Sequence, residues 1–157
     1  MTTIRIAFFA LAALAIAGCS AEAGDHKSGK AAKVEYLKAP GTEDMNLPFS
    51  AAVRVDNLLF LSGALGIVPG TRDLAEGGIQ PETKQTMENI SATLDMFGSS
   101  IDNVVKCTVF LADMGEWGAM NEVYRTFFEN PPARSALGAS GLALDARVEI
   151  ECIAVMN

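Results

Sequence analysis

The chain has 157 residues, half of them hydrophobic, which is enough for one domain with a substantial core. Its 19 acidic and 12 basic residues give a formal net charge of −7, which argues against a nucleic-acid partner because nucleic acid selects a basic face. The single histidine is His26, and no C-x-x-C or P-loop spacing occurs, so histidine-activated nucleophiles and histidine-rich metal sites are excluded from the rest of the chain.

Residues 1–18 have the organisation of a bacterial export signal. Arg5 gives a positive start, and the apolar run at 6–17 is too short to span a bilayer. A small residue then precedes Cys19, which is typical of a lipoprotein signal in which this cysteine becomes lipidated. We therefore expect an exported protein, anchored by lipid on the periplasmic side, and Ser20 favours the outer membrane. An ordinary secretory signal that leaves Cys19 free is the alternative.

Residues 19–33 are predicted to be a flexible linker that follows the lipidation site. They are alanine, glycine, serine and charged residues without an apolar period, and His26 lies among them. The folded domain is accordingly placed at residues 34–157.

The first half of the domain reads as strands followed by a helix. Strand-like runs occur at residues 34–37, 51–55 and 58–62. The polar pair Asp56-Asn57 between the last two indicates a hairpin. A glycine-rich loop at 63–78 leaves room for a short strand at 65–68. A helix then begins near Pro81 and ends before Gly98, which suits a C-terminal cap. Its apolar stripe is Thr83, Met87, Ile90, Leu94 and Phe97.

The second half of the domain again reads as a strand followed by a helix. A strand rich in valine, threonine and phenylalanine is predicted at 103–112, and Asp113 with Glu116 has the spacing of a capping box. A second helix follows and ends at Pro131-Pro132. Its apolar positions are Trp117, Met120, Val123, Tyr124 and Phe127.

Two further strands, at 134–139 and 146–156, complete a β-β-α-β-α-β-β pattern. We expect an α+β fold in which two helices cover one face of a mixed sheet of about six strands. The last strand places Val148, Ile150, Cys152, Ala154 and Met156 on one face. Ile153 and Val155 lie on the other face, which no helix can cover. A second copy of the chain would cover it, so a homo-oligomer is predicted.

Cys107 and Cys152 both fall inside predicted strands. Buried, unreactive thiols are the favoured interpretation. Export to an oxidising compartment also permits a disulfide, and the sequence alone leaves that alternative open.

Arg134 lies at a loop-to-strand junction, directly after the stiff Pro131-Pro132 pair and Ala133. A guanidinium fixed there can grip a carboxylate with two parallel hydrogen bonds. A surface arginine in an ordinary ion pair is the alternative.

Several stretches, in order and together spanning residues 36 to 156, resemble the RidA (YjgF-type) family. They are PFSAAVRV at 48–55, LLFLSG at 58–63, ENI at 88–90, VVKCTVFL at 104–111, NEVY at 121–124, FF at 127–128, PARS at 132–135 and VEIECIA at 148–154. Each stretch alone is weak evidence for the family, but together the stretches are specific to it. The resemblance implies a chorismate-mutase-like fold and a homotrimer with three clefts between subunits.

The resemblance also implies an activity, namely cofactor-independent hydrolysis of reactive enamines and imines such as 2-aminoacrylate to a 2-keto acid and ammonia. On this basis Arg134 would hold the substrate carboxylate, and Glu149 would orient or deprotonate the attacking water. Glu151 shares the face of Glu149 and is interpreted as a charge at the subunit seam or in solvent. The cleft walls would be Phe49, Ser62, Gly63 and the main chain of Ala136, with Asn121 and Tyr124 at the edge.

Two positions depart from the family pattern. The family commonly shows Gly-Pro-Tyr-Ser at residues 47–50, where Phe49 lacks the phenol hydroxyl. It also commonly shows Ser-Gly-Gln at 62–64, where this chain has Ala64. An exported, non-catalytic trimer that binds ligands or acts as a holdase is therefore one alternative. A second alternative is an enzyme that acts on another imine or on a carbamate-type compound. An endoribonuclease is disfavoured by the acidic chain and the lack of a histidine in the domain.

Overall fold

The computed structural model describes residues 30–42 and 44–157. The predicted signal, the lipidation site Cys19 and the linker up to residue 29 lie outside the described residues. Within the described part, no helix combines the length and apolar character needed to cross a membrane.

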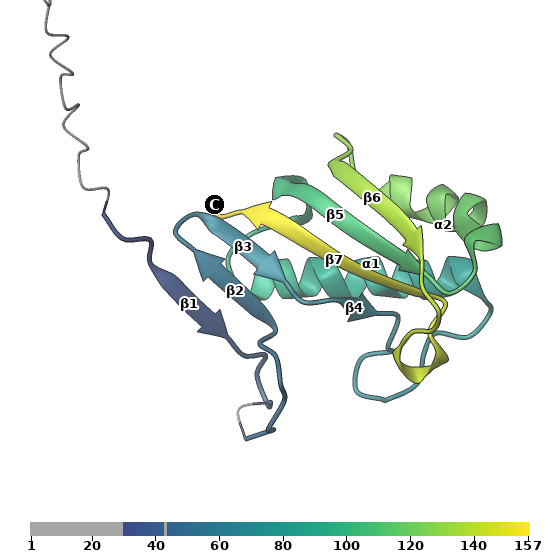
Figure 1. The fold of residues 1–157 in the computed structure, drawn as a ribbon, viewed down its shortest axis with the longest axis horizontal. Helices are drawn as coiled ribbons and strands as arrows, with labels where there is room; N and C mark the ends of the chain where they lie inside the picture. The colour runs from purple at the N-terminus through teal and green to yellow at the C-terminus, as the bar shows by residue number, and fades with distance from the viewer. Residues whose placement is uncertain (1–29, 43) are drawn as a thin grey trace, which may run out of the picture. The chain divides into compact units, whose positions relative to one another are not determined.

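Seven strands form one mixed sheet (Figure 1). They are β1 (Val34–Leu37), β2 (Ala52–Val55), β3 (Leu58–Leu61), β4 (Ala64–Leu65), β5 (Val104–Leu111), β6 (Ala133–Gly138) and β7 (Val148–Val155). Their order is β1-β2-β3-β7-β5-β6, and β4 also pairs with β7. Only β5 and β6 run parallel; the other pairs are antiparallel. The predicted fold class is confirmed, with the two-residue β4 as the seventh strand.

Both α-helices, α1 (Ile79–Met96) and α2 (Trp117–Tyr124), lie on one face of the sheet (Figure 1). The predicted stripe of α1 faces the core: Thr83, Met87, Ile90 and Leu94 are buried and Phe97 packs beside them. Gly98 has a φ of 82°, as its predicted capping position requires. Short 3-10 turns, η1 (Ile101–Asn103), η2 (Met114–Glu116), η3 (Arg125–Phe127) and η4 (Ala143–Asp145), complete the elements.

The predicted capping box before α2 is only half present. The Asp113 carboxylate accepts a hydrogen bond from the Gly115 N–H at 2.7 Å. Glu116 instead pairs with the guanidinium of Arg147, so its side chain serves a long-range contact rather than the cap.

The sheet face opposite the helices is partly apolar, and no described helix covers it. Phe60 and Leu137 have 38% and 44% of their surface exposed on this face. Ile153, which pairs with Phe60 across β3 and β7, is half-buried beside Phe60. The expectation of an uncovered apolar face is therefore confirmed within one chain.

Cys107 on β5 and Cys152 on β7 are register partners and form a disulfide. Their Cα atoms are 4.1 Å apart, and both residues are buried. The favoured interpretation of two free buried thiols is thus wrong. The deciding fact is the antiparallel register of β5 and β7, which places the two residues directly opposite each other.

Candidate active site

Arg134 is held on the helix-covered side of β6. It is the register partner of the buried Cys107, so its side chain points toward α2. Its Nη1 donates a hydrogen bond to Oδ1 of Asn121 at 2.6 Å. Its Cζ lies 4.8 Å from the ring centre of Tyr124 and 5.9 Å from that of Trp117. These contacts fix the direction of the guanidinium and leave most of its donors for a ligand.

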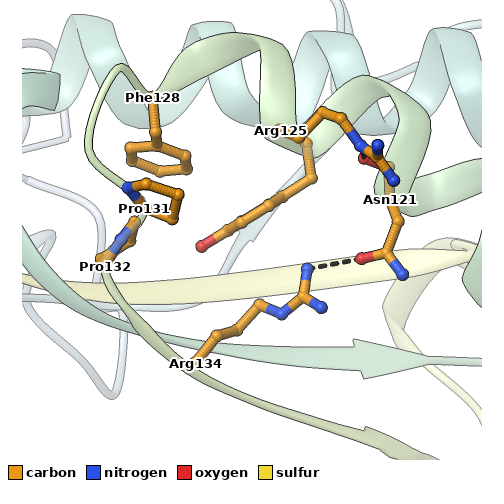
Figure 2. Close-up of a pocket in the computed structure, with 7 residues that line it drawn as sticks. Asn121, Arg125, Phe128, Pro131, Pro132 and Arg134 are labelled. Atoms are coloured by element: carbon orange, nitrogen blue, oxygen red, sulfur yellow. Dashed lines mark hydrogen bonds between the residues drawn. The ribbon is translucent and has the colours of Figure 1, made fainter.

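A hollow of about 410 Å³ opens beside this guanidinium, and we call it the Arg134 hollow. Its lining residues are Asn121, Tyr124, Arg125, Phe128, Pro131, Pro132 and Arg134. Figure 2 shows Arg134 reaching toward Asn121, while Phe128 and the two prolines close the other end. Two guanidinium groups beside an apolar wall suit a ligand that carries a carboxylate on an apolar body.

Tyr124 lines the Arg134 hollow, but its hydroxyl is buried. Only 5% of the residue is exposed, and its hydroxyl has no hydrogen-bond partner among the described residues. Burial raises the pKa of the Tyr124 phenol to about 12, although the nearby Arg134 charge acts in the opposite direction. The buried hydroxyl therefore stays protonated at neutral pH.

Glu149 lies in a different hollow, of about 290 Å³, which we call the Glu149 hollow. Its lining residues are Phe49, Ser62, Gly63, Leu65, Ala143 and Glu149. The Glu149 carboxylate rests directly on Gly63, because a Cβ added there would lie 1.9 Å from Oε1 of Glu149. Ser62 donates its hydroxyl to the carbonyl of Ser50 at 2.7 Å and so ties the end of β3 to the preceding loop.

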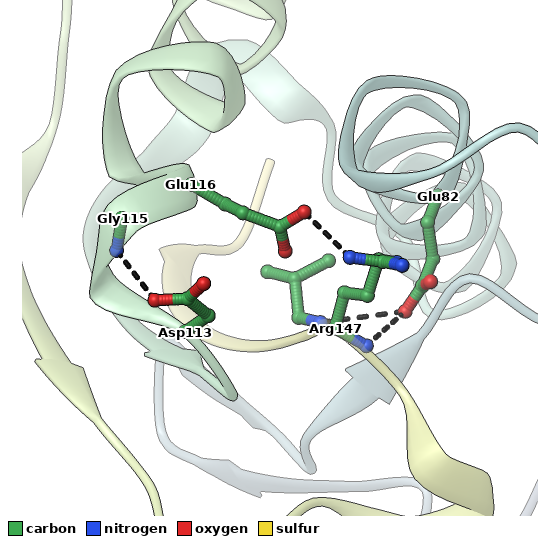
Figure 3. Close-up of polar contacts among 6 residues, drawn as sticks. Glu82, Asp113, Gly115, Glu116 and Arg147 are labelled. Carbon is green, nitrogen blue, oxygen red and sulfur yellow. Dashed lines mark hydrogen bonds and ion pairs between the residues drawn. The ribbon is translucent and has the colours of Figure 1, made fainter.

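The start of β7, just before Glu149, is anchored by a buried carboxylate. Glu82 on α1 is 4% exposed, and its Oε1 accepts the N–H groups of Arg147 and Val148 at 2.7 and 3.3 Å. Arg147 in turn pairs with Glu116, so that it lies between two acidic residues (Figure 3). This network joins α1, the start of α2 and β7 into one rigid support for Glu149.

The two hollows lie on opposite faces of the sheet. Arg134 shares its face with Cys107 and therefore with Cys152, which is bonded to Cys107. Glu149 is an odd number of residues from Cys152 along β7 and points the other way. These two side chains therefore cannot act on one small ligand within the same chain.

The predicted site residues thus divide into two groups. Asn121 and Tyr124 surround Arg134, while Phe49, Ser62 and Gly63 surround Glu149. Ala136 lies on the same face of β6 as Arg134 and packs against the core. Glu151 is exposed on the same face as Glu149.

Sequence reasoning missed several lining residues. Arg125 follows Asn121 by four residues, a spacing that puts both on one side of a helix and could have revealed it. Trp117 was assigned to the apolar stripe, but it is exposed and lies near Arg134. Leu65 and Ala143 enter the Glu149 hollow from β4 and η4, and no local sequence signal marks them.

Comparison with known proteins gives consistent matches over the described domain. Residues 41–156 match the family model described as endoribonuclease L-PSP. A mouse 2-iminobutanoate/2-iminopropanoate deaminase is 44% identical over 111 residues, which are 70% of this chain and 82% of that protein.

Two solved structures are also similar. RidA from the Antarctic bacterium Psychrobacter superposes with a TM-score of 0.67 at 33% identity, covering 81% of this chain and 99% of its own. TdcF of Escherichia coli with bound serine superposes with a TM-score of 0.67 at 29% identity, covering 78% of this chain and 94% of its own.

Proposed function

This chain belongs to the endoribonuclease L-PSP family, which is the RidA (YjgF-type) family, and from that premise we propose that it is an imine deaminase. The reaction is hydrolysis of a 2-imino acid to a 2-oxo acid and ammonia. The observation that carries the proposal is the Arg134 hollow, in which a fixed guanidinium beside an apolar wall can receive a carboxylate. The mouse relative named as a 2-iminobutanoate/2-iminopropanoate deaminase supports it.

The active site is proposed to form between subunits of a homotrimer. The Arg134 half-site of one subunit would meet the Glu149 half-site of the next. Two features support this arrangement, namely the opposite orientation of the two side chains and the exposed apolar face around Phe60 and Leu137. Each of three equivalent clefts would then contain one Arg134 and one Glu149.

In this cleft, Arg134 holds the substrate carboxylate. Holding that group fixes the position of the neighbouring imine carbon. Glu149 of the adjacent subunit accepts a proton from water as the water oxygen attacks the imine carbon, and it passes this proton to the imine nitrogen to give a carbinolamine. Glu149 then accepts the proton of the carbinolamine hydroxyl and delivers it to the amine nitrogen. The C–N bond breaks, ammonia leaves, and the oxygen becomes the carbonyl of the 2-oxo acid. The chemistry requires water and proton transfer and no cofactor.

Export and lipid anchoring at Cys19, on the periplasmic side and with the outer membrane favoured, remain part of the proposal. The Cys107–Cys152 disulfide supports export, because such bonds persist in oxidising compartments and are rare in the cytosol.

A non-catalytic, exported ligand-binding or holdase-like trimer is the second candidate, and Phe49 is the observation that favours it. The Phe49 ring is exposed at the Glu149 hollow and carries no hydroxyl to orient a substrate. Such a protein would bind carboxylate ligands in the same cleft without turnover.

The test is an imine-hydrolysis assay with the purified full chain. An amino-acid oxidase generates imines in situ from several amino acids, and semicarbazide traps those that escape hydrolysis. We expect the protein to accelerate imine loss and Arg134→Lys to lower the rate about 100-fold, because a lysine cannot form the forked contact.

The matched control is Arg54→Lys, which changes an exposed arginine on β2 that pairs with Glu35. It should retain the wild-type rate. A wild-type protein that hydrolyses no imine in this panel would overturn the deaminase proposal.

A further inference from the structure

Two arginine side chains line the Arg134 hollow, and Asn121 holds both of them. The side-chain Oδ1 of Asn121 accepts a hydrogen bond from Nη1 of Arg134 at 2.6 Å. The main-chain carbonyl of Asn121 accepts a second one, from Nε of Arg125 at 3.2 Å. Figure 2 shows both arginines reaching the neighbourhood of Asn121. Because the contact of Arg125 uses only its Nε, its terminal nitrogens keep their donors for a ligand.

No carboxylate of the protein neutralises these two arginines. The ion pairs among the described residues involve four other cations, which are Lys33, Arg54, Lys84 and Arg147. Within the described part of the chain, Arg125 and Arg134 therefore have no acidic partner, although acidic residues outnumber basic ones by 19 to 12. Two unpaired positive charges at one hollow attract an anion more strongly than the single charge that an α-carboxylate needs.

The hollow also has room and a suitable wall for a ligand with two acidic groups. Its volume of about 410 Å³ is in the range of small-molecule pockets. The rings of Tyr124 and Phe128 have their centres 5.0 Å apart and both line the hollow. A short methylene chain can pack against this aromatic wall, while the two guanidinium groups each offer donors to one acidic end.

We infer that Arg125 is a second anion-binding residue of the cleft, and that the cleft prefers imines of acidic amino acids, of the glutamate type, over uncharged imines of equal length. This inference rests on the proposed deaminase function and specifies its substrate class. Arg134 holds the carboxylate next to the imine carbon, and Arg125 holds the carboxylate at the end of the side chain. The negative charge of Glu149 in the adjacent subunit repels a side-chain carboxylate, which favours its placement at Arg125.

Two imines of equal length test this inference. The glutamate-derived and norvaline-derived imines share one carbon skeleton except that a terminal carboxylate in the first is a methyl group in the second. Amino-acid oxidases generate both in situ. We expect the ratio of kcat/KM to favour the glutamate-derived imine about tenfold or more, because a hydrogen bond to a charged group contributes strongly and a methyl group forms none.

The overall charge of the protein makes this ratio informative. A net charge of −7 by itself repels the ligand with the additional negative charge, so a ratio above one requires a local positive site. If both imines are hydrolysed with a ratio near or below one, the inference is overturned and the deaminase function stands.

The variant Arg125→Gln tests the assigned residue. Glutamine keeps a polar side chain at this exposed position and removes the positive charge, so the ratio should fall about tenfold. The matched control is Arg72→Gln, which makes the same change of charge in the exposed loop before α1, outside the lining of the Arg134 hollow. It should leave the ratio unchanged. An unchanged ratio in Arg125→Gln, or an equal fall in both variants, would contradict a site at Arg125.

A binding measurement separates failure of this inference from failure of the deaminase proposal. Trp117 is the single tryptophan, and its ring centre lies 5.9 Å from Cζ of Arg134, so its fluorescence reports ligands in the hollow. The probes are 2-oxoglutarate and 2-oxopentanoate, which are again matched in length. If no imine is hydrolysed but 2-oxoglutarate binds at least about tenfold more tightly, and Arg125→Gln removes the difference, the deaminase proposal fails and the two-arginine site stands. If no imine is hydrolysed and the two acids bind equally, or neither binds, both proposals are overturned.

Discussion

At the scale of single residues, the position of the Glu149 carboxylate depends on the absence of a side chain at Gly63. The Glu149 carboxylate occupies the space that a side chain at position 63 would need, with 1.9 Å between its Oε1 and an added Cβ. We expect Gly63→Ala to push the carboxylate out of place and lower kcat for imine hydrolysis by about 10- to 100-fold, because misplacing a catalytic group is costly even when the fold survives. Circular dichroism should show an unchanged fold.

The matched control is Gly118→Ala on the exposed side of α2. An added Cβ meets no described atom within 4 Å there. It should keep full activity and gain about 0.5–1 kcal/mol of stability, because alanine is the better helix former. Equal activity of the two alanine variants would contradict the placement of Glu149.

Tyr124 gives a pH-dependent prediction. Its folded pKa is about 12 against an ordinary value of 10.0, so between these values the folded chain retains a proton that the unfolded chain loses. The stability from the neutral buried phenol is therefore full below pH 10 and is lost as the pH rises toward 12. At pH 11 the loss is about 1.4 kcal/mol. Urea unfolding at pH 9 and pH 11 should show this extra loss in the wild type and not in Tyr124→Phe.

Tyr36→Phe is the control for this experiment, because Tyr36 is largely exposed. The stability of Tyr36→Phe should fall between pH 9 and pH 11 by as much as that of the wild type. At pH 7, Tyr124→Phe should be at least as stable as the wild type, since it removes an unpartnered buried hydroxyl. A pH profile of Tyr124→Phe identical to that of the wild type would contradict the perturbed phenol.

The residues of the site were predictable to different degrees. Arg134 was singled out by its place after a diproline together with the family resemblance, and Asn121 with Tyr124 was singled out by the family resemblance alone. That Arg134 and Glu149 point to opposite faces depends on the registers of β5, β6 and β7, which local sequence does not encode.

The Cys107–Cys152 bond acts at the scale of elements, since it joins β5 to β7 at the centre of the sheet. The two cysteines are 45 residues apart, so closing this loop restricts the unfolded chain and should stabilise the fold by about 2–4 kcal/mol. Urea unfolding at fixed protein concentration, with and without reductant, measures the difference. A variant with alanine at both positions should not respond to reductant. If reductant also left the unfolding of the wild-type protein unchanged, the disulfide would be absent.

Most elements followed from periodicity, and the apolar stripe of α1 is the clearest case, since Thr83, Met87, Ile90 and Leu94 are all buried. β4 did not: it is predicted at 65–68 but spans Ala64–Leu65. The side-chain amide of Asn89 on α1 donates hydrogen bonds to the carbonyls of Leu65 and Ile67 at 2.9 and 2.8 Å. A helix rather than a neighbouring strand therefore satisfies these two carbonyl groups. Such a long-range contact has no signature in the local sequence.

At the scale of the whole molecule, each chain has one candidate half-site on each face of its sheet. The exposed apolar side chains of Phe60 and Leu137 lie on the same face as Glu149. Covering this face with another subunit would bury them and bring a second chain toward the Glu149 hollow. Oligomer formation and completion of the active site would then be a single event.

The central claim, that Arg134 and Glu149 act together from different subunits, is tested most directly by mixing two inactive variants. Arg134→Ala and Glu149→Gln are purified separately, then unfolded together and refolded in equal amounts, and the formation of mixed oligomers is verified by mass. Random assembly gives about one cleft in four an intact pair, so we predict recovery of about a quarter of the wild-type imine-hydrolysis rate. If verified mixed oligomers remained as inactive as either parent, the two residues would not share a cleft between subunits.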